Sequence, residues 1–298
     1  MSQPPVHLVF GATGQVGYDL VRELAPLGRV VGLSRPEVDL ERLEAVRDAI
    51  RLHRPAIIWN AAAATAVDAL EDDPDLAFRV NATAPGVMAE EANRLGSLLV
   101  HFSTDYVFDG TKPEAWVEDD SPNPLNVYGR SKLAGEVAVR GAGGRHLILR
   151  TGWVYSSRGR NFVRAILGRA AAPDALRVVN DQVGAPTWSR ELARACARLA
   201  PRFAREDLSQ VLHLSAAGAC SWFEFATAIR EQLIAAGAPW NAPLEPVSSA
   251  QYGAKAVRPA NSVLSNDRFV ATFGFRLAPW NEVMVTPILE CVERPRPA

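Results

Sequence analysis

The chain has 298 residues, 48% of them hydrophobic, so it can bury a sizeable core as one large α/β unit or two domains. Its 32 basic and 33 acidic residues nearly cancel, which excludes the basic excess typical of nucleic-acid and membrane-surface binders. Three scattered cysteines exclude a disulfide framework and a C-x-x-C metal site. The chain shows neither a signal peptide nor an apolar run approaching the roughly 18 residues of a membrane helix. We therefore expect a soluble, cytoplasmic protein.

The first half of the chain alternates short apolar runs with longer amphipathic segments. The apolar runs predict strands at Val6–Phe10, Arg29–Leu33, Ala56–Trp59, Ser97–Ser103 and His146–Arg150. The segments between them predict helices at about Gln15–Pro26, Leu40–His53, Pro74–Leu95 and Tyr128–Arg140. Such alternation is typical of parallel strands joined by crossover helices. The fold class is therefore α/β, with a doubly wound parallel sheet.

The second half has a less regular rhythm. Helical spacing occurs at Asn161–Arg169 and Ser189–Ala200, and a short strand is expected at Leu212–Leu214. Ser221 and Glu224 have the spacing of a capping box, which predicts a helix that continues to Ile234. The segment Ala238–Asn261 shows no clear element. We infer a smaller second α/β domain.

A glycine-rich turn follows the first predicted strand. Gly11-Ala12-Thr13-Gly14-Gln15-Val16-Gly17 has the spacing G-x-x-G-x-x-G and leads into the first predicted helix. Glycines at these positions allow a tight turn and the close approach of a pyrophosphate, whose charge a helix N-terminus favours. The position of the motif between a strand and a helix predicts a dinucleotide site of the Rossmann type. The alternative is a turn that uses glycine for its geometry alone.

The end of the second predicted strand bears on which dinucleotide binds. An NAD-selective site usually places an acidic residue there to hold the ribose 2′-hydroxyl. This strand ends in Ser34 and Arg35, with no acid before Glu37. Because a guanidinium forms charge-assisted hydrogen bonds with phosphate, we expect NADP(H) to be preferred. The alternative is that Arg35 is solvated and NAD(H) is accepted as well.

A tyrosine and a lysine lie four residues apart at the start of a predicted helix. Tyr128 and Lys132 therefore share one helix face. An ammonium near a phenol would lower its pKa and help it exchange protons at neutral pH. Thr104 follows the fourth predicted strand, at the sheet edge where ligands of doubly wound folds bind. Thr104 would polarise a carbonyl, Tyr128 would deliver a proton, and Lys132 would lower the pKa of Tyr128. Such a set of residues suits hydride chemistry.

These motifs together resemble the extended short-chain dehydrogenase/reductases. Within that group the chain is similar to the dTDP-4-dehydrorhamnose reductase family. The similarity extends over nearly the whole chain, through Asn60–Ala63, Thr65–Asp68, Ser103–Phe108, Leu125–Gly129, Arg150–Tyr155, Asn180–Thr187 and Arg258–Ser262. The resemblance implies hydride transfer from a nicotinamide to the C4 keto carbon of dTDP-4-dehydro-β-L-rhamnose, giving dTDP-β-L-rhamnose.

The resemblance also implies a set of site residues. Thr104, Tyr128 and Lys132 would be catalytic, and Lys132 would also hold the nicotinamide ribose. The cofactor would be bound by the residues of the glycine-rich turn (Gly11, Thr13, Gly14, Gln15, Val16, Gly17) and by Ser34, Arg35, Asp39, Leu40, Ala62, Ala63, Ala64, Thr65, Tyr106, Tyr128 and Lys132. The substrate would be contacted by Val67, Thr104, Asp105, Tyr128, Trp153, Gln182 and Arg258.

The same resemblance suggests how the chain is divided and assembled. Residues 1–155 would form the NADP(H)-binding domain, with later returns near residues 188–215, and residues 156–298 would be mainly substrate-binding. Family members form homodimers, and some hold Mg²⁺ at the interface through acidic side chains. The matching positions are Asp19, Glu191 and one of Glu290 or Glu293. Asp19 has a shorter side chain than the glutamate expected there.

Two other readings stay open at this stage. Another nucleotide-sugar reductase, or an epimerase that retains its nicotinamide, would use the same scaffold. A non-catalytic partner, like the regulatory β subunit of methionine adenosyltransferase, would not need its catalytic residues. The presence of Thr104, Tyr128 and Lys132 together favours an enzyme. The sequence does not fix the configuration at C4, since rhamno and talo products differ only in the face that hydride attacks.

Overall fold

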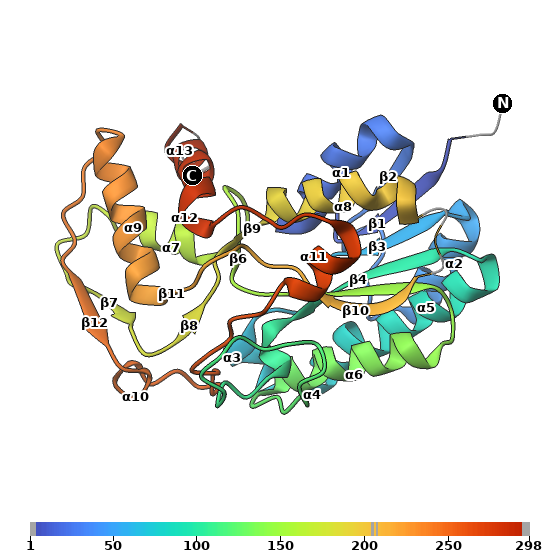
Figure 1. Cartoon of the computed structure of the whole chain (residues 1–298), viewed down its shortest axis with the longest axis horizontal. Coiled ribbons are helices and arrows are strands. Elements are labelled where there is room, and N and C mark those ends of the chain that lie inside the picture. Colours follow the sequence, from blue (N-terminus) through green and yellow to red (C-terminus); the bar gives the residue numbers. More distant parts are fainter. Residues whose placement is uncertain (1–3, 204–205, 207, 294–298) are drawn as a thin grey trace.

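A six-stranded parallel sheet is the centre of the larger part of the molecule (Figure 1). The computed structural model describes residues 4–203, 206 and 208–293. The strand order is β10-β5-β4-β3-β1-β2. The strands are β1 (Val6–Phe10), β2 (Arg29–Leu33), β3 (Ile57–Asn60), β4 (Leu98–Thr104), β5 (His146–Thr151) and β10 (Ser209–His213). The predicted doubly wound parallel sheet is confirmed.

Helices cover both faces of this sheet, which explains why its strands are apolar on both sides. One face packs against α1 (Gln15–Leu24), α8 (Ser189–Phe203) and α11 (Asp267–Phe273). The other face packs against α2 (Leu43–His53), α5 (Ala84–Leu95) and α6 (Val127–Gly141). The connections from β1 to β2 and from β2 to β3 place β3 and β2 on opposite sides of β1. The carboxyl ends of β1 and β3 therefore flank the crevice where such sheets bind ligands.

The long helix expected from Pro74 to Leu95 is interrupted. The structure has α4 (Pro74–Phe78), a π-helical turn η2 (Arg79–Thr83) and then α5. Pro85 lacks the N–H that would bond the carbonyl of Asn81 in a continuous α-helix. That carbonyl instead faces α6 at Gly135, where any β-carbon would overlap it. The interruption therefore lets the two helices approach closely.

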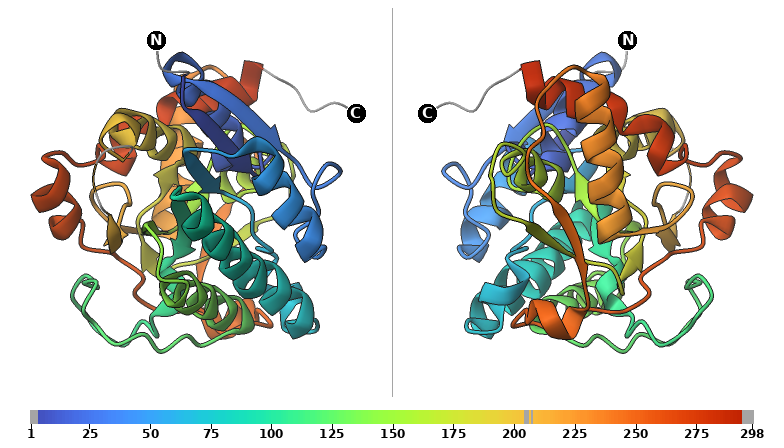
Figure 2. Two further views of the ribbon diagram at one scale, coloured as in Figure 1. Left: turned by 90° about the vertical axis from the view of Figure 1, so that its right-hand side faces the viewer. Right: turned by 90° about the vertical axis from the view of Figure 1, so that its left-hand side faces the viewer.

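The smaller part of the molecule combines short strand pairs with helices (Figure 2, right). Its strands are β6 (Val154–Tyr155), β7 (Leu176–Val179), β8 (Val183–Gly184), β9 (Thr187–Trp188), β11 (Cys220–Ser221) and β12 (Leu244–Val247). Its helices include α7 (Phe162–Leu167), α9 (Trp222–Ala235), α10 (Ser249–Tyr252), α12 (Trp280–Val283) and α13 (Val285–Glu293). The Ser221 capping box is present as predicted. The expectation of no element between Ala238 and Asn261 is wrong, because β12 pairs with β7 and a second capping box starts α10.

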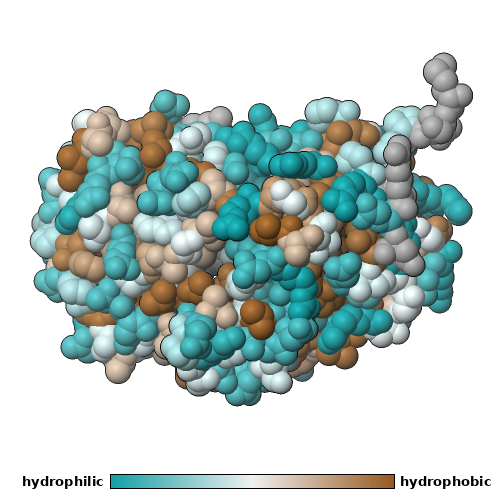
Figure 3. Space-filling model, viewed as in Figure 1, coloured by the Kyte–Doolittle hydropathy of each residue, from teal (hydrophilic) through white to brown (hydrophobic). Residues whose placement is uncertain are grey.

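The remaining described elements are the short helix α3 (Val67–Leu70) and the 3₁₀ turns η1 (Ala25–Leu27) and η3 (Asp105–Val107). The face of the molecule in Figure 3 intermixes hydrophilic and hydrophobic residues. Within the described part of the chain, no helix has both the length and the apolar character needed to cross a membrane.

Candidate active site

The glycine-rich turn connects β1 to α1 in a conformation that requires glycine at two points. Gly11 has a φ of +78°, and a β-carbon there would lie 2.9 Å from the Cα of Ala62. A β-carbon on Gly17 would overlap the carbonyl oxygen of Gly11. The backbone N–H of Gly11 donates to Leu33 O at 2.9 Å, which fixes the turn to the end of β2. The first N–H groups of α1, which have no intrahelical partners, therefore face the crevice and can bind an anion.

A cavity of 250 Å³ lies between this turn and the end of β2. Gly11, Thr13, Gly14, Ser34, Arg35, Asp39, Leu40, Ala62, Ala63 and Ala64 are among its lining residues. Arg35 is largely exposed but is held by two carboxylates, Asp39 Oδ2 at 3.2 Å and Glu41 Oε1 at 2.6 Å. The backbone N–H of Ser34 donates to Glu37 Oε2 at 2.6 Å. The cavity therefore offers both a guanidinium and acidic groups to a ribose or its phosphate.

A second cavity, of 510 Å³, lies at the carboxyl ends of β3, β4 and β5. Its lining includes Gln15 and Val16 from α1, Ala62, Ala63, Thr65 and Val67 after β3, Thr104, Asp105 and Tyr106 after β4, Tyr128 and Lys132 from α6, and Trp153 after β5. Every predicted cofactor-binding residue except Gly17 thus lines one of these two cavities. The topology therefore brings together segments that are far apart in the sequence.

Tyr128 lies in the first turn of α6. Asn126 caps this helix, its side-chain oxygen accepting from the N–H of Gly129 at 2.8 Å. A β-carbon on Gly129 would overlap the carbonyl oxygen of Tyr106, so glycine lets the helix start press against the segment after β4. This contact brings Tyr128 beside Thr104, with which it shares a hydrogen bond. The two hydroxyls can therefore meet one substrate oxygen.

Lys132 is fully buried one turn further along α6. Its Nζ donates to the carbonyl oxygen of Phe102 at 2.6 Å and lies 3.4 Å from Nε2 of His101. Burial lowers the pKa of Lys132 to about 8, and the carboxylate of Glu136 acts in the opposite direction. Lys132 therefore titrates much closer to neutral pH than an ordinary lysine.

The pKa of Tyr128 differs from the sequence prediction. Burial raises this pKa to about 12, the hydrogen bond with Thr104 lowers it in part, and the charge of Asp105 raises it. We expected Lys132 to lower it, and this is wrong because desolvation dominates and the Lys132 amine is engaged by the Phe102 carbonyl. Tyr128 is consequently protonated at neutral pH, which suits a group that donates a proton.

Asp105 is the buried acid of the site. Its Oδ1 accepts from the Thr104 hydroxyl at 3.0 Å. Burial raises its pKa to about 6, and hydrogen bonds from Ser262 and Thr104 partly offset that increase. A β-carbon on Gly152 would overlap this carboxylate. The chain therefore keeps a costly buried carboxylate next to the Thr104 hydroxyl in the wall of this cavity.

Trp153 lies at the boundary between this cavity and the smaller part of the molecule. Its φ of +50° is in the left-handed region, which is uncommon for a residue with a side chain. Its indole stacks on Trp222 with a centroid separation of 3.4 Å, and its Nε1 donates to Ser262 Oγ at 3.1 Å. The strained backbone of Trp153 thus occurs where the two stacked indoles lie beside the buried Asp105.

A third cavity, of 470 Å³, lies on the other side of Trp222, which lines both. Gln182 and Arg258 line this cavity, whereas Val67, Asp105 and Trp153 line the previous one. The side-chain amide of Gln182 donates to Ser249 Oγ at 2.8 Å. An ion pair of 2.7 Å joins Arg258 to Asp68. The predicted substrate contacts are thus divided between two cavities that share one indole.

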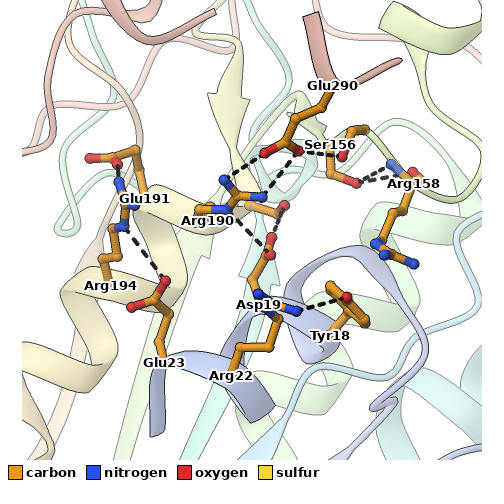
Figure 4. Close-up of polar contacts among 12 residues, drawn as sticks. Tyr18, Asp19, Arg22, Glu23, Ser156, Arg158, Arg190, Glu191, Arg194 and Glu290 are labelled. Atoms are coloured by element: carbon orange, nitrogen blue, oxygen red, sulfur yellow. Dashed lines mark hydrogen bonds and ion pairs between the residues drawn. The ribbon is translucent and has the colours of Figure 1, made fainter. Parts of the chain in front are cut away.

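Asp19, Glu191 and Glu290, three of the acids matched to the Mg²⁺ site, contact other side chains of the same chain (Figure 4). Asp19 is buried and accepts from Ser189 Oγ at 2.6 Å, while Arg190 lies 3.7 Å from Asp19 and 2.8 Å from Glu290. Glu191 is paired with Arg194 at 2.9 Å, and Glu293 is exposed at the end of α13. No group of three or more His, Cys, Asp or Glu among the described residues could hold a metal. These contacts within one chain engage Asp19, Glu191 and Glu290, and Mg²⁺ at an interface between two copies stays a prediction.

Several buried side chains of the site were not predicted. Asn81, in the π-helical turn, accepts from the N–H of Ala64 and donates to its carbonyl, each at 2.9 Å. The side-chain amide of Asn81 thus pairs with the backbone of the segment after β3, as a neighbouring strand would. Asn60 contacts Nδ1 of His101 at 3.0 Å across adjacent strands. The only sequence signal for these residues is a polar side chain within an otherwise apolar segment.

The fold and this site together define a short-chain dehydrogenase/reductase of the extended type. A family model described as the RmlD substrate binding domain matches residues 7–292. A dTDP-4-dehydrorhamnose reductase from Burkholderia thailandensis is 46% identical over 283 residues, covering 92% of this chain and 94% of the relative. The chain belongs to the dTDP-4-dehydrorhamnose reductase family.

Other relatives agree with this assignment. A dTDP-4-dehydrorhamnose reductase from Escherichia coli K12 is 41% identical over 280 residues, covering 92% of this chain and 93% of the relative. A dTDP-4-dehydrorhamnose reductase from Bacillus anthracis, solved in complex with NADP, superimposes with a TM-score of 0.88 at 32% identity. The superposition covers 97% of this chain and 100% of that structure.

Proposed function

We propose that this protein reduces the C4 keto group of dTDP-4-dehydro-β-L-rhamnose with NADPH, giving dTDP-β-L-rhamnose. The observation that carries the proposal is the convergence of Thr104, Tyr128 and Lys132 in one cavity with the glycine-rich turn. The family assignment supplies the substrate class. When bound, the reduced nicotinamide supplies the hydride for C4.

The residues of the chain handle the oxygen that becomes negative as C4 is reduced. The Thr104 hydroxyl, which donates to Asp105 Oδ1 in the free protein, turns its proton toward this oxygen, and Tyr128 transfers its phenolic proton to it. The raised pKa of Tyr128 favours this direction because the phenol enters the reaction protonated. Lys132 holds the nicotinamide ribose. Val67, Asp105 and Trp153 orient the sugar.

The third cavity provides room for the nucleotide end of the substrate. Its walls combine apolar side chains such as Ile166 and Val178 with the guanidinium groups of Arg169, Arg177 and Arg258. A nucleoside diphosphate needs both kinds of surface. We accordingly propose that residues 1–155, with residues 188–215, bind the cofactor and that residues 156–298 mainly bind the substrate.

We propose NADP(H) as the preferred form of the nicotinamide cofactor because Arg35 lines the cavity at the end of β2. The carboxylates of Asp39 and Glu41 compete for the same guanidinium, so NAD(H) would be used as well. Measuring kcat/KM for NADPH and NADH before and after Arg35→Ala tests the preference, and an unchanged ratio would remove the argument. The family resemblance also predicts a homodimer, which light scattering of the purified protein would test.

The proposed activity is tested by incubating the purified protein with dTDP-4-dehydro-L-rhamnose and NADPH. A reductase consumes one equivalent of NADPH per product molecule, followed by the absorbance of the reduced nicotinamide. An epimerase would convert the sugar with no net consumption, and a non-catalytic partner would do neither. The configuration of the product at C4 then separates the rhamno from the talo sugar.

A further inference from the structure

The loop of residues 156–161 connects β6 to α7 and packs against the start of α1. Asn161 caps α7 through its Oδ1, which accepts from the N–H of Arg164 at 3.1 Å. The Nδ2 of the same side chain donates to Gln15 Oε1 at 2.9 Å. One amide therefore joins the loop to the first residue of α1.

Two further contacts hold the 156–161 loop in place. The guanidinium of Arg158 lies 3.8 Å from the centroid of the Tyr18 ring on α1 (Figure 4). Ser157 donates to Glu290 Oε2 at 2.7 Å. Gly159 turns the chain at a φ of +65°, beside the side chain of Gln15. The conformation of the loop is thus determined from both sides of residue 160.

Arg160 is the residue that this arrangement leaves available. It is exposed and lines the 510 Å³ cavity together with Gly14, Gln15 and Val16. The side chain forms neither a hydrogen bond nor an ion pair with any other residue that the structure describes. The other cation that lines this cavity, Lys132, is buried and lies at the Tyr128 end. Arg160 therefore places an uncompensated positive charge at the mouth of the cavity, on the side of the glycine-rich turn.

We propose that Arg160 binds the diphosphate of the dinucleotide cofactor from the side opposite the N-terminus of α1. This inference rests on the proposed nicotinamide-dependent function. The N-terminus of α1 carries only a partial positive charge, roughly half an elementary charge, whereas the diphosphate carries two negative charges. A guanidinium contacts phosphate oxygens in a bidentate manner and remains charged at any working pH. Arg160 thus supplies the charge that the helix alone lacks.

The binding experiment compares Arg160→Ala with the wild-type protein using three ligands. NADP⁺ carries the cofactor diphosphate, adenosine 2′-monophosphate lacks a diphosphate, and thymidine diphosphate represents the nucleotide end of the substrate. We expect the Kd for NADP⁺ to increase about tenfold. This is the lower end of the range for losing a hydrogen bond to a charged group, because the site is exposed. The Kd values for the other two ligands should not change. The NADP⁺ difference should diminish as salt is added.

Two further variants separate charge at this position from a general effect on the protein. Arg160→Lys should restore most of the NADP⁺ affinity, since it keeps the charge but loses the bidentate contact. Arg140→Ala, an exposed arginine in the last turn of α6, removes the same charge far from the cavity and should leave all three Kd values unchanged.

The outcomes are distinct. Unchanged NADP⁺ affinity in Arg160→Ala would overturn the inference, and so would weaker thymidine diphosphate binding with NADP⁺ unaffected, which would assign Arg160 to the sugar nucleotide. Equal weakening of all three ligands would indicate a disturbed site and would overturn it too. Failure of the wild-type protein to bind NADP⁺ would instead contradict the proposed function itself.

Discussion

Asp105 is a buried carboxylate whose removal should stabilise the protein while impairing catalysis. Its neighbours are the Thr104 hydroxyl, at 3.0 Å, and Gly152, where any β-carbon would overlap the carboxylate. Asp105→Asn keeps the size of the side chain and an oxygen that accepts from Thr104, but removes the charge. The variant therefore separates the electrostatic effect of this residue from its packing.

The size of the expected stabilisation follows from the pKa of Asp105. Burial raises the pKa of Asp105 from 3.8 to about 6, and each pH unit corresponds to about 1.4 kcal/mol, so ionising this group costs the folded state about 3 kcal/mol. Because the folded pKa is above the unfolded one, stability is greatest below about pH 3.8 and decreases until the pH passes about 6. The stabilisation by Asp105→Asn should therefore increase by about 1.5 kcal/mol between about pH 5 and pH 8.

Urea unfolding of wild type and variant at these two pH values measures the difference. Asp48→Asn, which removes an exposed carboxylate from α2, is the matched control. The same Asp105→Asn variant should lower kcat/KM at least about tenfold, because a charged group facing the substrate has been lost. A stability difference that is identical at both pH values would refute the reasoning from burial.

Three further predictions follow from the site. Tyr128→Phe removes the proton donor and keeps the ring, so kcat should decrease roughly 10²–10⁴-fold with little change in cofactor affinity, and a wild-type rate would contradict the mechanism. The pKa of about 8 for Lys132 predicts that kcat/KM decreases above that pH as the ammonium loses its proton, and a flat profile would argue against its role. Glu136 forms a buried 2.7 Å ion pair with Arg150, so Glu136→Gln should cost about 3–5 kcal/mol of unfolding free energy in urea titrations, and a loss below about 1 kcal/mol would contradict this.

Local spacing was enough to predict the parts of the site that depend on a single segment. Gly11, Gly14 and Gly17 could be assigned from their spacing, and the tight strand-to-helix turn requires glycine at Gly11 and Gly17. Tyr128 and Lys132 could be placed on one face because a helix repeats every 3.6 residues. The sheet class followed from the alternation of apolar runs, which both covered faces of a parallel sheet require.

Contacts between distant segments could not be predicted from spacing. Asn81 acts through Ala64, and it does so from a π-helical turn that arises where Pro85 removes a hydrogen bond. Trp222 lies in a helix predicted only from its capping box, and its place between two cavities depends on Trp153. The pKa of Tyr128 depends on burial, which no sequence pattern reports.

The acids matched to a metal site also have contacts with distant segments that the sequence did not reveal. Acidic residues at the matching positions suggested Mg²⁺, but the structure places Arg190 between Asp19 and Glu290. The spacing of the acids along the sequence did not reveal this neighbouring guanidinium.

Hydride transfer to the sugar is tested most directly with NADPH that carries deuterium at C4 of the nicotinamide on the transferred face. The purified protein would be incubated with this cofactor and dTDP-4-dehydro-L-rhamnose, and the product analysed by mass spectrometry and NMR. We predict one deuterium per product molecule, located at C4 of a rhamno sugar, with one NADPH oxidised for each. A product without label at C4, or sugar conversion without oxidation of NADPH, would contradict the account.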